Sequence, residues 1–128
     1  MRALLDTHGF VWMNDDDPRL SRRARELIAD GGVRLDLSLA SVWELTIKVG
    51  LGRLRLPMPI EEYVPTRMRT QSLQLLEIRL DHVLRVASLP PIHGDPFDRL
   101  LIAQAQVERL PILTADPHIA RYDVETIW

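Results

Sequence analysis

The chain has 128 residues, of which 46% are hydrophobic and 27% charged, a composition that excludes disorder as its main state. The absence of cysteine excludes a disulfide scaffold, a thiolate zinc site, an iron–sulfur cluster and a cysteine nucleophile, and the net charge of −2 provides no overall basic field. No apolar run is long enough for a membrane span or a signal-peptide core, so we expect a cytoplasmic protein with a single domain over residues 1–128.

Segments of strand and helix character alternate along the chain. The pattern predicts, in order, a strand at 2–5, a helix at 21–30 with Ser21 as N-cap, a strand at 33–37, helices at 41–49 and 60–70, a strand at 73–78, a helix at 80–88, a helix that opens at Asp95-Pro96, and strands at 112–114 and 125–128. This alternation predicts an α/β fold in which helices cover both faces of a mostly parallel sheet of about four to five strands.

Five acidic residues fall beside the predicted carboxyl ends of strands. Asp6 and Asp116 follow strands directly, Glu44 lies in the first turn of a helix, and Asp95 and Asp98 begin another helix. Because ligand sites of parallel sheets lie at this edge, we expect these side chains to gather there. Gathered carboxylates repel one another, and a hard divalent cation such as Mg²⁺ or Mn²⁺ relieves that repulsion. Such a site suits phosphodiester hydrolysis better than zinc chemistry.

Most of these acids also have an ordinary structural explanation. The Ser41–Glu44 segment matches a capping box, the segment 95–98 combines an N-cap with a proline and an acid at a helix start, and Asp116-Pro117 repeats the N-cap pattern. Asp6 can cap a short helix, but burying its charge at a strand end costs free energy unless it is paired. The common location of the five acids favours the functional interpretation.

Four longer segments resemble the PIN-domain ribonucleases, and among them the virulence-associated protein C (VapC) toxins of toxin–antitoxin pairs. They cover nearly the whole chain in the family's order. These segments are LLDTHGFVW (4–12), ASVWELTIKVGLGRLRLP (40–57), HGDPFDRLLIAQAQ (93–106) and LTADPHIARYDVETIW (113–128). The resemblance implies a single Rossmann-like PIN domain over residues 1–128, with three α/β/α layers.

The resemblance also implies a Mg²⁺-dependent endoribonuclease site, at which Mn²⁺ can substitute. Metal-activated water would attack an RNA phosphodiester and leave 5′-phosphate and 3′-hydroxyl ends. Asp6 and Asp98 would be the principal metal ligands, and Glu44 and Asp116 would complete the cluster. Supporting residues would be Asp95, which caps a helix, Thr7 and Thr114, which orient waters or acids, and Arg99, which touches phosphate.

The family further implies a homodimer and a cognate antitoxin that covers the active-site groove. Asp36 departs from the apolar pattern of related chains, which predicts that the second strand is short or lies at an exposed bend. Haloacid-dehalogenase phosphatases and receiver domains fit poorly, because His8 stands where the former need a second aspartate and Lys48 lies in the wrong half for the latter. Two alternatives stay open: a non-catalytic PIN-fold module that binds RNA or protein, and a nuclease that acts on DNA.

Overall fold

Five short strands form one all-parallel sheet in the order β3-β2-β1-β4-β5. The computed structural model describes all residues, 1–128, and places β1 in the middle of the sheet, where Leu4 lies opposite Asp36 of β2 and Ile112 of β4. The expected α/β architecture is confirmed. The strands are β1 (Arg2–Leu5), β2 (Arg34–Ser38), β3 (Gln74–Leu76), β4 (Ile112–Leu113) and β5 (Thr126–Ile127).

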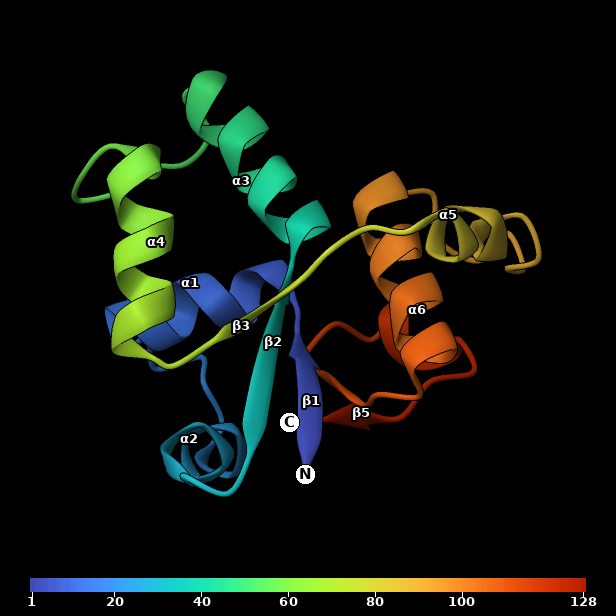
Figure 1. Cartoon of the computed structure of the whole chain (residues 1–128), viewed down its shortest axis with the longest axis horizontal. Helices are drawn as coiled ribbons and strands as arrows, with labels where there is room; N and C mark the ends of the chain where they lie inside the picture. Colours follow the sequence, from blue (N-terminus) through green and yellow to red (C-terminus); the bar gives the residue numbers. More distant parts are fainter.

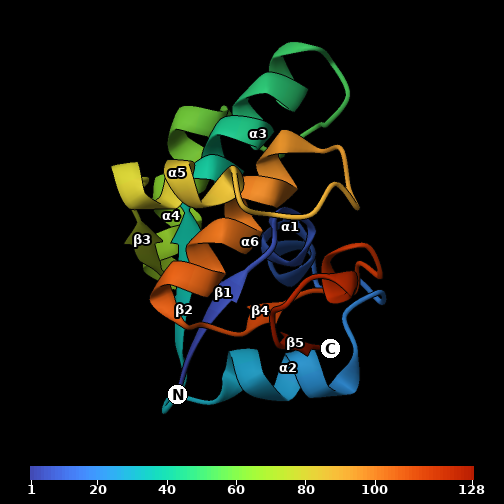
Figure 2. The ribbon, with the colours of Figure 1, turned by 90° about the vertical axis from the view of Figure 1, so that its right-hand side faces the viewer.

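Alternate side chains of β1 enter two separate hydrophobic cores, one on each face of the sheet. Ala3 and Leu5 belong to the first core, which includes side chains of α1 (Thr7–Asp15), α2 (Arg22–Ala29), α3 (Leu39–Gly50) and α4 (Ile60–Thr70). Leu4 belongs to the second, which lies under α6 (Pro96–Glu108) and η1 (Ile119–Arg121), with α5 (Leu80–Val86) packed on α6. The helices therefore form the two outer layers of an α/β/α sandwich (Figures 1 and 2).

Side-chain caps set the starts of two predicted helices. Ser21 accepts the amide hydrogen of Ala24 and begins α2, and Asp95 accepts those of Phe97 and Asp98 at the start of α6, as the sequence predicts. Two other caps differ from the prediction. These two differences concern Glu44 and Asp116, which are both candidate site residues.

The prediction of a capping box at Ser41–Glu44 is wrong. Helix α3 begins at Leu39, because the hydroxyl of Ser38 accepts the amide hydrogen of Ala40 and makes Ser38 the N-cap. Glu44 consequently lies in the second turn of α3 and not in the first, where its carboxylate is free to contact other elements.

The helix start predicted at Asp116-Pro117 is also wrong. Asp116 accepts the amide hydrogen of His118 at 2.8 Å, but only the single turn η1 follows, with His118 at its N-cap position. The hydrogen bond from the His118 amide to the Asp116 carboxylate thus stabilises a tight turn that follows β4.

The expectation for Asp36 is wrong as well, because β2 runs without a break from Arg34 to Ser38 and Asp36 is fully buried. Two arginines make this possible: Arg2 Nη2 lies 2.5 Å from Oδ2 of Asp36, and Arg34 Nε lies 3.0 Å from Oδ1. Arg34 lies two residues before Asp36 on β2, and the pairing of Arg2 with Arg34 across the parallel strands brings the second cation to the buried carboxylate.

Candidate metal centre

The predicted acids gather above the carboxyl ends of β1, β2 and β4. Asp6 follows β1, Asp116 lies two residues beyond Thr114 at the end of β4, Glu44 extends from α3, and Asp98 lies in the first turn of α6. Helices α3 and α6 pack against each other above this edge of the sheet (Figure 1). Their packing brings together acids that are distant in sequence.

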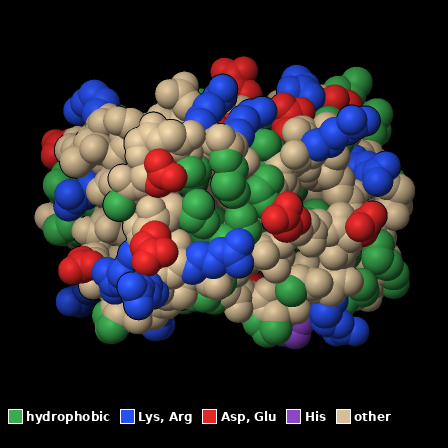
Figure 3. Space-filling view, turned by 90° about the horizontal axis from the view of Figure 1, so that it is seen from below, with side chains coloured by type: hydrophobic (Ala, Val, Ile, Leu, Met, Phe, Trp, Pro, Cys, Tyr) green, Lys and Arg blue, Asp and Glu red, His purple; other side chains and the backbone are tan.

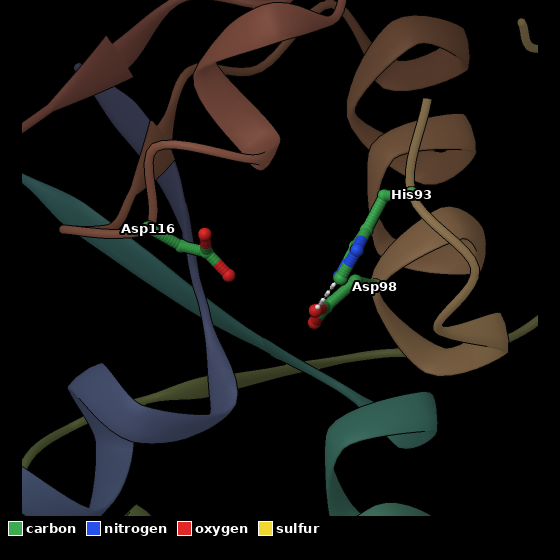
Figure 4. Close-up of side chains that lie close together, drawn as sticks. All are labelled: His93, Asp98 and Asp116. Carbon is green, nitrogen blue, oxygen red and sulfur yellow. Dashed lines mark hydrogen bonds and ion pairs between the residues drawn. The ribbon is translucent and has the colours of Figure 1, made fainter. Parts of the chain in front are cut away.

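The tightest group joins His93, Asp98 and Asp116. One ligand atom from each of these side chains can be chosen so that all three atoms lie within 4.8 Å of one another. His93 Nε2 is hydrogen-bonded to Asp98 Oδ2 at 2.9 Å, and the carboxylate of Asp116 faces this pair from the loop after β4 (Figure 4). The ring of His118 stacks on that of His93 with centroids 5.0 Å apart, which holds the imidazole in place.

Asp6 lies beside this group and is held rigidly. Its Oδ1 accepts the amide hydrogen of Gly9 at 2.5 Å, which caps α1, and its Oδ2 accepts the hydroxyl hydrogen of Thr114 at 2.5 Å. Thr114 in turn accepts the amide hydrogen of Asp116 at 3.0 Å. Asp6 and Asp116 line one depression together with Trp12. These contacts connect the ends of β1 and β4 through a single threonine.

Glu44 is positioned by two neighbours on opposite sides. Thr7 Oγ1 lies 2.7 Å from Oε1 of Glu44 and 3.0 Å from Oγ of Ser41. Because a carboxylate only accepts, the Thr7 hydroxyl donates to Glu44 and accepts from Ser41. Lys48 Nζ lies 2.8 Å from the other oxygen, Oε2, of Glu44. The buried carboxylate therefore keeps a fixed orientation toward Asp98.

Burial and nearby negative charge raise the pKa of two of these acids, Asp98 and Asp6. Burial raises the pKa of Asp98 to about 6; the charges of Asp95 and Glu44 act in the same direction, and the hydrogen bond from His93 opposes it. Burial also raises the pKa of Asp6, against the hydrogen bonds from Thr114 and the Gly9 amide. Negative charge is thus destabilised at Asp98 and Asp6, and a bound cation would offset that cost.

The donor set fits a hard divalent cation. In an octahedral Mg²⁺ site with metal–oxygen distances of about 2.1 Å, opposite ligands lie about 4.2 Å apart. Ligand atoms within 4.8 Å of one another are therefore close enough to share one cation. Carboxylate oxygens with water suit Mg²⁺ or Mn²⁺, and an imidazole nitrogen suits the transition metal better.

The two remaining predicted residues, Asp95 and Arg99, make hydrogen bonds that stabilise neighbouring segments of the protein. Asp95 is the N-cap of α6, as predicted, and adds negative charge beside Asp98. Arg99 donates to the carbonyl oxygen of Pro90 at 2.9 Å and to the hydroxyl of Tyr122 at 3.1 Å. Tyr122 also accepts the amide hydrogen of His93 at 2.8 Å. Arg99 therefore stabilises the loop that carries His93.

Four residues of the site are not among those predicted. His93 has a recognisable signal, since it lies two residues before Asp95 in the segment shared with PIN domains, whereas His118 and Ser41 have none that the sequence pattern shows. The fourth residue, Gly9, is required for steric reasons. A Cβ there would lie 2.7 Å from Oδ1 of Asp6, closer than van der Waals contact allows.

Replacing Gly9 by alanine is therefore expected to displace the Asp6 carboxylate and reduce metal binding about tenfold or more, with a loss of stability of about 1–3 kcal/mol. Metal titration by calorimetry and urea unfolding measure the two effects. Gly31→Ala is the matched control, because nothing lies within 4 Å of a Cβ at that glycine. Equal metal affinity of Gly9→Ala and the control would contradict the positioning role of Gly9.

Comparison with known proteins identifies one family and several similar folds. The family model described as the PIN domain matches residues 3–125. No curated protein is significantly similar in sequence. The VapBC2 complex from Rickettsia felis, solved bound to a DNA fragment from their promoter, has a TM-score of 0.74 at 15% identity and covers 99% of this chain and 98% of that chain.

Two further solved structures are similar over almost the whole length of both chains. A toxin–antitoxin complex from Klebsiella pneumoniae has a TM-score of 0.66 at 18% identity, covering 98% of this chain and 96% of that chain. FitAcB from Neisseria gonorrhoeae has a TM-score of 0.63 at 20% identity, covering 100% and 97%. At these identities the similarity shows a common fold.

Proposed function

The chain belongs to the PIN-domain family, and from this premise we propose that it is a Mg²⁺-dependent endoribonuclease of the VapC type, the toxin of a toxin–antitoxin pair. The observation that carries the proposal is the group of carboxylates at the carboxyl edge of the sheet, with Asp98 and Asp116 facing each other and the pKa of Asp98 raised to about 6. An acid cluster of this kind is what phosphodiester hydrolysis with a divalent cation needs.

In this proposal Asp6, Asp98, Glu44 and Asp116 hold the cation, directly or through water, and Mn²⁺ can replace Mg²⁺. His93 orients Asp98 through its hydrogen bond, and Thr114 and Thr7 orient Asp6 and Glu44. The bound cation supplies a more acidic water and offsets negative charge on the phosphate. Hydrolysis of the bond between phosphorus and the 3′ oxygen would leave 5′-phosphate and 3′-hydroxyl ends.

The protein partners in the proposal are an antitoxin and a second copy of the chain. The similar structure from Klebsiella pneumoniae is a toxin–antitoxin complex, which supports an antitoxin partner here. A homodimer remains an expectation from the family, and Leu80 and Leu84 of α5, which are 74% and 62% exposed, offer an apolar surface for it. None of the helices combines the length and apolar character that crossing a membrane requires.

The decisive experiment incubates the antitoxin-free protein with a mixed RNA pool in Mg²⁺, in Mn²⁺ and in EDTA, beside Asp6→Asn and a single-stranded DNA pool. We expect RNA cleavage that requires both the metal and Asp6, with 5′-phosphate ends. Cleavage of DNA alone would assign a DNA nuclease instead. RNA binding that survives EDTA without any cleavage in metal would identify a non-catalytic module.

Metal binding should also appear as a change in stability, because only the folded chain assembles the carboxylates. At a free Mg²⁺ or Mn²⁺ concentration of tenfold Kd, we expect the unfolding free energy to rise by about 1.4 kcal/mol. Differential scanning fluorimetry over a millimolar range measures this, with Ca²⁺-free buffer and EDTA as the reference. A melting temperature that is the same with and without metal would contradict a preformed site.

A further inference from the structure

A second depression lies beside α1 and shares part of its lining with the depression at the acidic site. It lies between α1 and α3 and the loop after α3, and its lining includes Arg19, Lys48 and Arg53. It shares His8, Trp12 and Arg19 with the depression that contains Asp6 and Asp116. A chain-like ligand that occupies the acidic site can therefore continue into this second depression without leaving the surface.

The charge of this second depression is opposite to that of the acidic site. Three permanently cationic side chains line it, against one acid, Asp15. By contrast, the face at the amino ends of the strands carries basic side chains interspersed with Asp and Glu around a small hydrophobic area (Figure 3). In a chain of net charge −2, the lining of the second depression is a local basic surface adjacent to the acids.

Free donors remain on each of these cations. Arg19 uses Nε and Nη2 on Asp17, which leaves Nη1 available, and its guanidinium is held 4.5 Å over the ring of Trp12. Lys48 uses one of three donors on Glu44. The side chain of Arg53 is exposed and has no acid within ion-pair distance and no hydrogen bond within the chain.

We propose that this depression binds a backbone phosphate of single-stranded RNA next to the one that is cleaved, with Arg19, Lys48 and Arg53 as its ligands. The inference depends on the proposed function, because it names the path of that substrate. A nucleic-acid strand repeats its negative charge at every nucleotide, so one strand can place one phosphate at the cation of the acidic site and the next among the arginines. Lys48 lies at the junction, where it also holds Glu44.

Two side chains, His8 and Arg19, already pack on the ring of Trp12, which favours backbone binding over base stacking in this depression. The ring of His8 stacks on Trp12 with centroids 5.5 Å apart, and Arg19 covers the indole at 4.5 Å. A base would have to displace one of these groups, whereas a phosphate meets exposed nitrogen donors directly. We therefore expect binding with little dependence on base identity.

Arg53 is the residue to test, because its side chain is exposed and makes no hydrogen bond or ion pair within the protein. Arg55 provides the matched control: it lies in the same loop, is exposed, carries the same charge and does not line the depression. The probe is a short fluorescein-labelled single-stranded RNA of mixed sequence, measured by fluorescence anisotropy in EDTA so that it is not cleaved. Affinity is measured over a series of salt concentrations.

Arg53→Ala is expected to weaken RNA binding about fivefold at 0.1 M salt and to reduce the slope of log K against log salt by about 0.7, as the loss of one phosphate contact on a single strand requires. Arg55→Ala should leave both values near those of the wild type. Equal effects of the two substitutions, or no effect of Arg53→Ala, would overturn the phosphate site.

Two companion measurements separate this result from the proposed function. The first is cleavage of the RNA pool in Mg²⁺ by wild type and by Arg53→Ala. It shows whether the protein is a nuclease even if Arg53 does not bind phosphate. A labelled oligoglutamate peptide, run beside the RNA, shows whether the depression prefers an acidic peptide. Arg53-dependent binding of the peptide without Arg53-dependent binding of RNA overturns the proposal, and a wild type that neither binds nor cleaves RNA overturns the proposed function with it.

Discussion

Replacing Asp98 by asparagine is expected to reduce metal-dependent RNA cleavage by about a hundredfold or more, and at the same time to stabilise the metal-free protein. The activity falls because the substitution removes a carboxylate from the group that faces Asp116 and adds an amide that binds divalent cations poorly. Stability rises because asparagine removes a charge that burial, Asp95 and Glu44 all disfavour.

The sign of the pH dependence follows from the direction of the shift. The pKa of Asp98 is raised from 3.8 to about 6, so between these values the folded state binds more protons than the unfolded state and stability falls as pH rises. Above pH 6 the wild type carries the whole penalty, at most about 3 kcal/mol for two pKa units. The gain from Asp98→Asn should therefore be largest near pH 7.5 and disappear near pH 4.

Urea unfolding in EDTA at pH 4 and pH 7.5, together with cleavage assays in Mg²⁺, measures both parts of this prediction. Asp123→Asn is the control, since Asp123 is an exposed acid whose carboxylate has no ion pair. An Asp98→Asn protein that cleaves RNA as fast as the wild type would remove Asp98 from the proposed ligands. A stability gain that is the same at both pH values would show that the gain does not come from the charge.

Removing the two arginines that face Asp36 is expected to destabilise the fold by about 3 kcal/mol or more. With Arg2→Met and Arg34→Met, the fully buried carboxylate of Asp36 loses the only cations near it, at 2.5 Å and 3.0 Å. Methionine keeps most of the apolar stem of arginine without its guanidinium, so the lost charge is the principal change. Urea unfolding at pH 7 gives the difference in free energy.

Adding Asp36→Leu to that double variant should restore most of the lost stability. A buried charge without a partner is costly, whereas an apolar side chain on the central part of a parallel sheet is well tolerated. If the triple variant is as unstable as the double variant, the loss comes from the packing of the arginine side chains and not from the uncompensated charge. Circular dichroism of each variant confirms that the comparison is made between folded proteins.

Short-range features of the chain determined much of the fold. The alternation of strand and helix patterns was enough to predict a parallel α/β sheet, and the N-caps Ser21 and Asp95 lie where the sequence placed them, because a cap depends on residues within one helical turn. The acids at 6 and 116 could be assigned to one edge of the sheet for the same reason, since both directly follow strands that run in parallel.

Features that depend on how distant segments pack could not be read in this way. Ser38 and Ser41 are equally good capping residues, and only the end of β2 at Ser38 decides that the helix starts there. Glu44 then lies in the second turn, where its carboxylate contacts Thr7 and Lys48. Asp36 looks like an interruption of a strand until the pairing of β1 with β2 brings Arg2 beside it.

The candidate metal centre also depends partly on local sequence and partly on tertiary packing. Asp98 is visible in the sequence as an acid at a helix start, but its pairing with His93 and its approach to Asp116 exist only because the loop before α6 and the turn after β4 face each other. The meeting of Arg19 with Lys48 and Arg53 is likewise a product of the packing of α1 beside α3. Local pattern and capping determined which elements form and where the acids follow strands. Strand register and helix packing, which act between residues far apart in the chain, decided which of those side chains meet.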